Sequence, residues 1–362
     1  AVAWHPGADA SAKREKQREA LAAILDGEQL RADITVLAFP GERATTRFVT
    51  LPFTDAKKID ATIGGELEDL VPFELDTAVF SHERLETVGD QSLSLCAVAP
   101  REQVAEQLDI LKGRSIDPRN MPIDVLQLYN LYTHFLAEDA SKAEIPSAPA
   151  SEGATDREVG GAQPVDARLV VDIGHERTLL CAASPAGVAH VRVIRTGGAD
   201  VTSAVAKHYG LDWQAAEDGK HEDAFVASTR HPAPSDAAQR MSDAVARGLE
   251  LLVRELRRTL RAIRSERRVR IARIDLVGGG SRIRNLAQYL AEELDVPVAM
   301  GVAVEQAVER QVDASRRAAH ACALACALRA VAEKPVSEID LRVGEFAYAG
   351  QMRHLRRRIP II

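Results

Sequence analysis

The chain has 362 residues, which is too long for one ordinary hydrophobic core, so we expect two or three domains. Its formal net charge of −7 disfavours nucleic acid as a partner, and its aromatic content of 4% disfavours an aromatic-lined groove for sugars or single-stranded nucleic acid. The four cysteines include no CxxC pair and no cluster with zinc-ligand spacing, which indicates a protein of a reducing compartment.

The first half of the chain alternates predicted helices and strands, which indicates α/β layering. A helix near residues 12–25 precedes a buried strand at 34–39, which Pro40-Gly41 ends. Thr54 or Asp55 can cap a helix whose apolar residues recur at spacings of three and four. The other elements expected in this half are strands at 47–51, 78–85 and 92–99, helices at 101–112 and 124–136, and a strand-like piece before Pro122.

Residues 138–166 interrupt this alternation. They are rich in Ala, Ser, Glu and Gly, they contain Pro146, Pro149 and Pro164, and they keep no apolar period. Such a segment cannot bury enough surface to offset the entropy of ordering it, so we predict a flexible linker or an extended surface loop.

The second half begins with a hydrophobic run at 168–173. A strand pair at 178–184 and 190–195 follows, and then a helix that ends near Gly210. A long amphipathic helix with one apolar stripe is predicted from about Ser235 to Arg268. The remaining predicted elements are a strand at 271–277, a helix at 285–294, a strand at 296–300 and an Ala-rich helix at 314–332.

Two loops in this half contain glycine. Asp172-Ile173-Gly174 follows the first strand, and Gly278-Gly279-Gly280-Ser281 follows the strand at 271–277. Glycine lets backbone N–H groups approach a phosphate, and the Asp172 carboxylate could hold a magnesium ion through water. A glycine loop that opens a helix also lets an adenosine or phosphate group approach. Each motif alone is most often a turn, but their order and spacing favour a nucleotide cleft.

The order of these elements resembles the second half of an actin-like ATPase. The resemblance is carried by Asp172-Ile173-Gly174, Gly197-Gly198-Ala199-Asp200, the long helix and the triple glycine. More narrowly, the chain resembles the type IV pilus assembly protein PilM and the cytoplasmic domain of the type II secretion protein GspL. The segments that carry this narrower resemblance are Leu51–Ile59, Glu66–Phe73, Arg282–Leu290 and Gly344–Ala347, and it extends over nearly the whole chain except the linker.

This resemblance implies a two-lobed, actin-like (ribonuclease H-like) α/β fold with a small inserted α+β domain at 52–122. The first lobe would comprise residues 1–51 and 123–137, and the second lobe residues 167–335, followed by a juxtamembrane segment at 336–362.

The resemblance also implies a site for ATP and magnesium in the second lobe. The second phosphate loop would contain Asp172, Gly174 and Thr178, with Asp172 at the metal, and the adenosine loop would contain Gly278, Gly279, Gly280 and Ser281. The implied partners are a secretion or pilus assembly ATPase, which is hexameric, and an inner-membrane platform. A homodimer is a further state to consider.

The sequence departs from actin-like ATPases in one respect. Those proteins open with a first phosphate loop, in which Asp-x-Gly follows a strand and precedes Ser, Thr or Lys. This chain has Asp-x-Gly followed by a strand only at Asp172, which is half of a phosphate clamp. We therefore expect a scaffold without catalytic residues that links the assembly ATPase to the membrane platform. The alternative is an ATP-binding switch or weak ATPase.

Three charged segments call for an interpretation, and two of them allow an alternative. The basic cluster Arg353–Arg358 precedes Ile359-Pro360-Ile361-Ile362, which predicts either an approach to a membrane helix after Ile362, at the cytoplasmic face of the inner membrane, or a plain basic end. We interpret Glu66, Glu68, Asp69 and Glu74 as a solvated face. The arginines of the long helix, Arg254, Arg257, Arg258, Arg261 and Arg264, are expected to be exposed, with a partner or anionic-lipid surface as the less favoured alternative.

Overall fold

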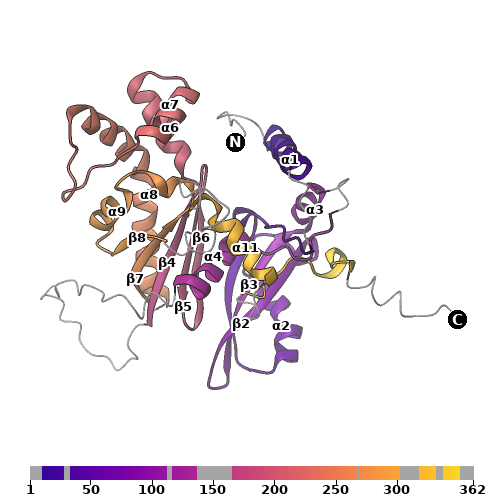
Figure 1. Cartoon of the computed structure of the whole chain (residues 1–362). Helices are drawn as coiled ribbons and strands as arrows, with labels where there is room; N and C mark the ends of the chain where they lie inside the picture. Colours follow the sequence, from indigo (N-terminus) through magenta and orange to yellow (C-terminus); the bar gives the residue numbers. More distant parts are fainter. Residues whose placement is uncertain are drawn as a thin grey trace, which may run out of the picture.

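The computed structural model describes residues 10–27, 33–111, 116–136, 165–267, 269–301, 318–331 and 337–350, and the statements below concern these residues. The predicted linker, apart from its last two residues, and the basic cluster at 353–358 lie outside them. Two sheets with helices on their faces make up the body of the molecule (Figure 1).

The larger sheet has the strand order β6-β5-β4-β7-β8. Strands β4, β7 and β8 run parallel to one another, whereas β5 and β6 continue from β4 as antiparallel hairpins. Because both faces of a sheet with parallel strands are covered, β4 contains a continuous apolar run rather than an alternation. The five strands are β4 (Val165–Ile173), β5 (Thr178–Ser184), β6 (Gly187–Ile194), β7 (Val269–Val277) and β8 (Val298–Met300).

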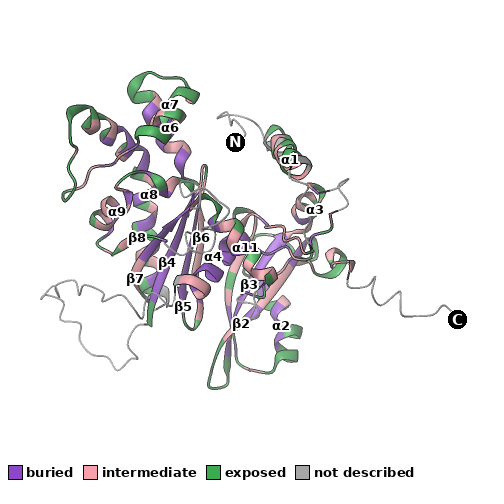
Figure 2. Ribbon diagram, in the orientation of Figure 1, coloured by how far each residue is buried: buried purple, intermediate pink, exposed green. Residues whose placement is uncertain are grey.

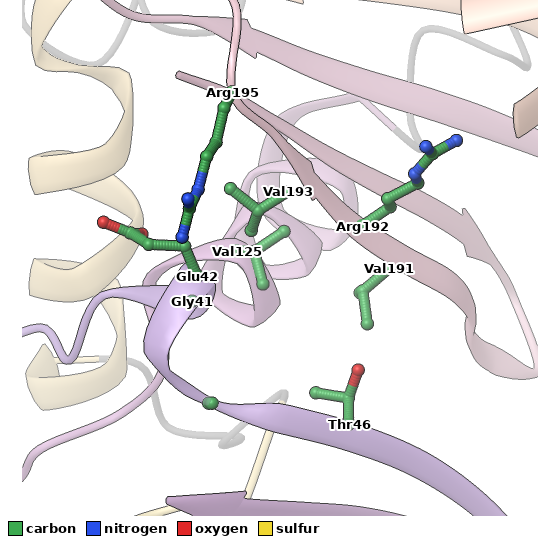
Figure 3. A pocket seen from close by; sticks show the side chains of 9 residues that line it. Gly41, Glu42, Thr46, Val125, Val191, Arg192, Val193 and Arg195 are labelled. Atoms are coloured by element: carbon green, nitrogen blue, oxygen red, sulfur yellow. The ribbon is translucent and has the colours of Figure 1, made fainter. Parts of the chain in front are cut away.

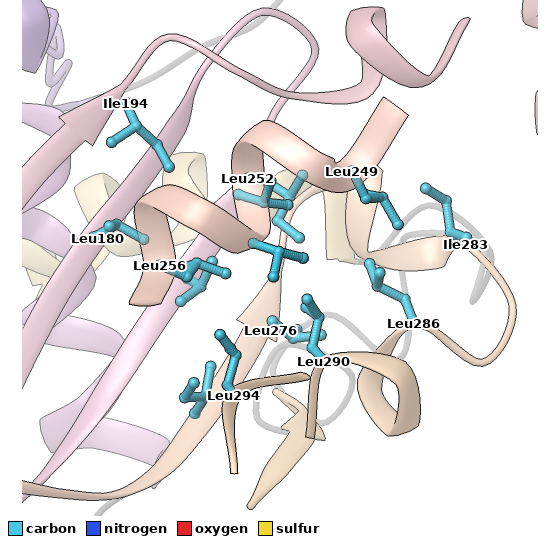
Figure 4. Close-up of a cluster of buried hydrophobic side chains, with 14 of the residues drawn as sticks. Leu180, Ile194, Leu249, Leu252, Leu256, Leu276, Ile283, Leu286, Leu290 and Leu294 are labelled. Carbon is cyan, nitrogen blue, oxygen red and sulfur yellow. The ribbon is translucent and has the colours of Figure 1, made fainter. Parts of the chain in front are cut away.

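One face of this sheet is covered by α6 (Gly198–Tyr209), α8 (Asp236–Arg267) and α9 (Leu286–Leu294). Figure 4 shows leucines of α8 and α9 gathered around Leu276 of the sheet. The apolar stripe of α8, which includes Leu252 and Leu256, lies in one buried cluster with residues of β7 and α9. The predicted long helix is therefore confirmed.

A further helix on this side, α7 (Trp213–Asp223), was not predicted from the sequence. It is mostly polar, so it has no clear apolar period. Its start is marked by Asp212, whose side chain accepts a hydrogen bond from the Ala215 N–H at 2.8 Å.

The smaller sheet is antiparallel, with the order β1-β3-β2, and contains β1 (Thr45–Leu51), β2 (Ala78–Val88) and β3 (Gln91–Pro100). Helix α2 (Ala56–Glu68) packs on one face through Ile59, Ile63 and Leu67. We predicted that the inserted domain begins at residue 52, which leaves β1 in the first lobe. However, β1 pairs with β3 along its whole length, so this sheet already begins at Thr45.

Helix α4 (Asp124–Leu131) lies between the two sheets, and all eight of its residues are buried (Figure 2). It shares one core with Leu95 of β3, Leu179 of β5 and Ala325 of α11 (Ala321–Val331). The predicted helix at 124–136 ends as an α-helix at Leu131 and continues as one turn of π-helix, η3 (Tyr132–Leu136).

The predicted strand at 34–39 is reduced to two isolated parallel bridges, Val36 with Asn120 and Phe39 with Ile123. The carbonyl oxygens of Asn120 and Pro122 accept from the N–H groups of Leu37 and Phe39 at 3.0 and 2.7 Å, but Pro122 has no N–H to donate in return. A continuous ladder therefore does not form here. The remaining elements of the first half are α1 (Ala10–Gly27), η1 (Gly41–Arg43), η2 (Leu75–Thr77) and α3 (Arg101–Asp109).

Residues 337–343, which we call the terminal strap, bond both to the segment before α4 and to β2 of the smaller sheet. The N–H of Leu341 donates to the carbonyl oxygen of Met121 at 3.0 Å, and Asp340 accepts from the Asn120 side chain at 2.6 Å. On β2, the Glu83 carboxylate accepts from the N–H of Glu338. The strap continues into η6 (Gly344–Phe346).

Candidate functional site

The two glycine-bearing loops meet at the carboxyl ends of β4 and β7. These strands run parallel with Asp172 opposite Val277, so the loop after each strand leaves the sheet at the same edge. Gly278 has a φ of 88°, and a Cβ built there would lie 2.1 Å from Oδ1 of Asp172. At Gly280, the Cβ would lie 2.4 Å from Cγ2 of Ile173. The structure therefore brings the two predicted loops into direct contact, and glycine is required at these two positions.

The two predicted hydroxyl groups bond within the protein. Thr178 is fully buried at the start of β5, and its Oγ1 donates to the carbonyl oxygen of Thr196 at 2.8 Å. Oγ of Ser281, in η4 (Gly279–Arg282), donates to the carbonyl oxygen of Gly278 at 2.7 Å. Neither hydroxyl is available to a phosphate in this arrangement.

Backbone N–H groups of both loops are also used within the protein. The Gly174 N–H donates to the carbonyl oxygen of Arg177 at 2.9 Å, and the Gly198 N–H donates to that of Gly174 at 2.9 Å. The Gly278 N–H donates to the carbonyl oxygen of Ala318 at 2.8 Å. Because phosphates in such loops are held by backbone N–H groups, these three donors are not free for a phosphate in this arrangement.

Three charged residues that the sequence did not single out as functional, Glu42, Asp124 and Arg177, form what we call the arginine cluster. Arg177, in the loop after β4, pairs with Glu42 in η1 and with Asp124 at the start of α4, where its Nη2 lies 2.9 Å from Oδ2. The other oxygen of Asp124 accepts the Gly41 N–H at 2.8 Å. The arginine cluster therefore joins the two halves of the chain across the cleft. From the sequence, Asp124 could be recognised only as the start of a predicted helix, and Arg177 only as a residue of the predicted loop.

Around Arg177, carboxyl groups outnumber guanidinium groups. Burial, and then the nearby charge of Asp124, raise the pKa of Asp172 to about 6, while Arg177 opposes this shift. Burial also raises the pKa of Asp124 to about 6, against the opposing effects of Arg177 and the Gly41 N–H. Among the described residues, no group donates a hydrogen bond to the Asp172 carboxylate. One guanidinium therefore faces three carboxyl groups.

A cavity of about 250 Å³ opens beside Glu42, between η1, the start of β1, and β6 (Figure 3). Its wall includes Val125 of α4 and Val193 of β6, and Arg195 extends along the same wall as Glu42. None of the seven predicted site residues lines this cavity. It is therefore separate from the contact between the two glycine loops.

A buried lysine supports the loop before α6 and was also missed by the sequence reasoning. Nζ of Lys220, on α7, bonds to Oε2 of Glu217 at 2.7 Å and to Oγ1 of Thr202 at 2.8 Å. It also donates to the carbonyl oxygen of Gly198 at 3.2 Å. Burial lowers the pKa of this amine, while the Glu217 carboxylate opposes the shift.

A family model described as the type IV pilus assembly protein PilM matches residues 8–331. The chain belongs to the PilM family. A comparison with curated proteins gave no match.

A structure described as the PilM-PilN type IV pilus biogenesis complex is 24% identical, with 91% of this chain and 90% of that chain covered and a TM-score of 0.68. This likeness confirms the predicted two-lobed actin-like fold of a PilM-family protein. More distant likenesses are to MreB5 of Spiroplasma citri bound to AMPPNP (10% identity, 87% and 74% covered, TM-score 0.44) and to the cytoplasmic domain of EpsL from the type II secretion system of Vibrio cholerae (12%, 64% and 79%, 0.32).

Membrane-spanning helices and metal-binding clusters are both absent from the residues that the structure describes. No helix in the described ranges is both long and apolar enough to cross a membrane. No group of three or more His, Cys, Asp or Glu side chains in those ranges is placed to hold a metal ion.

The three consecutive glycines should differ sharply in their tolerance of alanine. We expect Gly278→Ala and Gly280→Ala each to lower the free energy of unfolding by roughly 2–4 kcal/mol, because the new methyl group would overlap β4 and, at 278, the φ angle is strained. Gly279→Ala is the matched control, since its Cβ would meet only Ala319 at 3.9 Å. Urea unfolding of the three variants checks this, and equal losses would contradict the described loop contact.

The raised pKa of Asp172 has a consequence for stability at different pH values. The folded state binds this proton more tightly than the unfolded state, so the contribution of Asp172 to stability falls as pH rises from about 4 to about 6. We expect Asp172→Asn to raise the free energy of unfolding by about 3 kcal/mol at pH 7.5 and to change it little at pH 4. Urea unfolding at both values measures this, with Asp90→Asn in the exposed β2–β3 turn as control. A loss of stability at pH 7.5 would mean that the ionised carboxylate has a favourable partner.

Proposed function

We propose that this PilM-family chain is a scaffold at the cytoplasmic face of a bacterial inner membrane, where it links the assembly ATPase of a pilus or secretion machine to the membrane platform. In this proposal the chain does not hydrolyse ATP and has no catalytic residues. The arginine cluster is the observation that carries the proposal. Arg177 spans the cleft between the loop after β4 and the start of α4, where a nucleotide would have to bridge the two lobes.

Electrostatics supports the same proposal. The guanidinium of Arg177 lies among the carboxyl groups of Glu42, Asp124 and Asp172, which leaves a negative balance around the cleft when all three are ionised. A triphosphate brought to this place would be repelled unless a cation came with it. In addition, the ion pairs of Arg177 would have to break before the lobes could part around a ligand.

A nucleotide-dependent switch is the second candidate. It is favoured by the Asp172 carboxylate, which is 8% exposed and has no hydrogen-bond donor among the described residues. A carboxylate of this kind could face a magnesium ion that arrives with ATP. The predicted roles of Gly174, Thr178 and Ser281 toward ATP remain proposals that belong to this second candidate.

Calorimetry with ATP and magnesium separates the two candidates. For the full-length protein we expect no detectable heat of binding, because the loop donors and Arg177 are already engaged. Saturable binding that disappears in Asp172→Ala and persists in Asp166→Ala would favour the switch. Asp166 is a suitable control because it is paired with Arg270 at the surface, away from the cleft.

The partner part of the proposal needs its own test. We expect the full-length protein to capture the assembly ATPase of its own machine in a pull-down, to the same extent with and without ATP. A scaffold whose lobes are joined by ion pairs has no reason to change its affinity with nucleotide. Failure to capture the ATPase under both conditions would contradict the scaffold role.

A further inference from the structure

The long helix α8 changes in charge along its length. Its first part, residues 236–250, contains three acids and two arginines, whereas residues 251–265 contain one acid and five arginines. All five of these arginines are exposed, as predicted from the sequence; they are Arg254, Arg257, Arg258, Arg261 and Arg264. The second part of the helix therefore presents a concentrated positive charge to the solvent.

Four of these arginines form one continuous row on the outer side of α8, which we call the α8 stripe. Their spacings of four, three and three residues keep them on one side of the helix, opposite the apolar residues that α8 contributes to the core. At 1.5 Å per residue the row is about 15 Å long. The α8 stripe consists of Arg254, Arg258, Arg261 and Arg264.

The carboxylates that lie closest to this surface are already engaged by other arginines. Glu255, the one acid among residues 251–265, pairs with Arg192 of β6 and is only 17% exposed. Its other oxygen lies 3.9 Å from Nε of Arg254, which is a weak contact. On the opposite side, Glu293 of α9 pairs with Arg257. These two acids therefore neutralise Arg192 and Arg257, which flank the α8 stripe, rather than the stripe itself.

The α8 stripe has little compensation for its charge within the chain. In the described part of the chain, the side chains of Arg258, Arg261 and Arg264 have no ion pair and no hydrogen bond. The side chain of Arg254 is 75% exposed. Glu250, an exposed acid one turn before Arg254, forms no ion pair with the stripe among the described residues. The stripe is thus free to meet an anionic surface.

The stability of the fold does not account for this row of arginines. Like charges three and four residues apart on a helix repel one another, so the row weakens α8 when nothing binds to it. A helix dipole favours cations, but only within about the last turn of the helix. Because α8 ends at Arg267, that turn includes Arg264 but not Arg254, Arg258 or Arg261.

The chemistry of the surface points to one class of anionic partner. Among the described residues of α8, no large apolar side chain is exposed. A protein interface usually has an apolar or aromatic centre, and an amphipathic helix that enters a bilayer needs exposed apolar residues. A layer of anionic lipid headgroups, in contrast, attracts a cluster of cations alone. Because charge is screened beyond about 8 Å at physiological salt, the stripe governs this contact more than the net charge of the chain.

We propose that the α8 stripe binds the anionic headgroups of a phospholipid bilayer. The helix would lie along the membrane surface, with its guanidinium groups among the lipid phosphates and no side chain inserted into the hydrocarbon. This contact adds direct membrane binding to the proposed scaffold. The choice of a membrane over nucleic acid as the anionic surface rests on that proposed function.

The test is co-sedimentation of the full-length protein with sucrose-loaded vesicles. We expect binding to vesicles of equal parts phosphatidylglycerol and phosphatidylcholine, and this binding should weaken steeply as salt is raised. Vesicles of phosphatidylcholine alone should not bind the protein, because they have no net negative charge. Equal binding to both kinds of vesicle would contradict an electrostatic contact.

Two triple variants of the α8 stripe separate charge from shape. Arg258→Gln, Arg261→Gln, Arg264→Gln should bind the anionic vesicles at least about tenfold more weakly. The same three positions changed to lysine should keep most of the binding, because a headgroup layer responds to the charge and not to the fork geometry of guanidinium.

The matched control removes three exposed arginines outside α8. The variant Arg119→Gln, Arg230→Gln, Arg282→Gln should bind the vesicles as the parent does. Thermal unfolding checks that the glutamine variant of the stripe is folded. It should unfold at the same temperature as the parent or slightly higher, because the three arginines make no described side-chain contacts and repel one another.

Three results would overturn the proposal. Equal vesicle binding by the glutamine variant of the stripe and by the control would place the lipid contact elsewhere, for example at Arg353–Arg358. Loss of binding in the lysine variant would indicate a site that recognises guanidinium geometry, as in a protein partner. Absence of vesicle binding, with stripe-dependent binding of duplex DNA, would identify nucleic acid as the partner. Capture of the assembly ATPase needs no vesicles, so failure here leaves the scaffold role to be judged separately.

Discussion

Strand β4 is the element on which the rest of this structure depends. Val170 points into the core that contains α4, whereas Leu169 and Val171 belong to the core beneath α8, so one strand contributes to both. Its parallel pairing with β7 also sets where the two glycine loops leave the sheet. The contact of Gly278 with Asp172 is a direct result of that pairing, because no side chain could be placed between the two loops.

Much of the fold could be predicted from periodicity and turn chemistry. The long helix predicted at 235–268 is α8 at 236–267, and the strands that follow each glycine or proline turn are present. Prediction failed where local signals were weak or overridden. Helix α7 has little apolar pattern, and the strand at 34–39 loses its ladder because the segment it pairs with contains Pro122, which has no N–H to donate. A sequence window at 34–39 contains no information about the segment that will lie beside it.

The candidate site was predicted in part. The sequence correctly predicted that Asp172 and the triple glycine lie close together, since both loops follow parallel strands of one sheet. It could not show that the hydroxyl groups of Thr178 and Ser281 bond to nearby carbonyl oxygens, because a motif gives residue types and not hydrogen-bond partners. Nor could it join Arg177 to Asp124, which lies 53 residues earlier in a different element.

The terminal strap gives the molecule a mechanical property. Its bonds to Met121, Asn120 and Glu83 lie side by side across the strap, and Ile339 and Leu341 are fully buried between them. Tension applied along residues 344–350 would load these bonds together, as in shear, rather than opening them one at a time. Such a force would reach α4 and β2 at once, because Met121 precedes α4 and Glu83 belongs to β2. Traction on the strap would therefore act on the smaller sheet and on the segment that leads into α4.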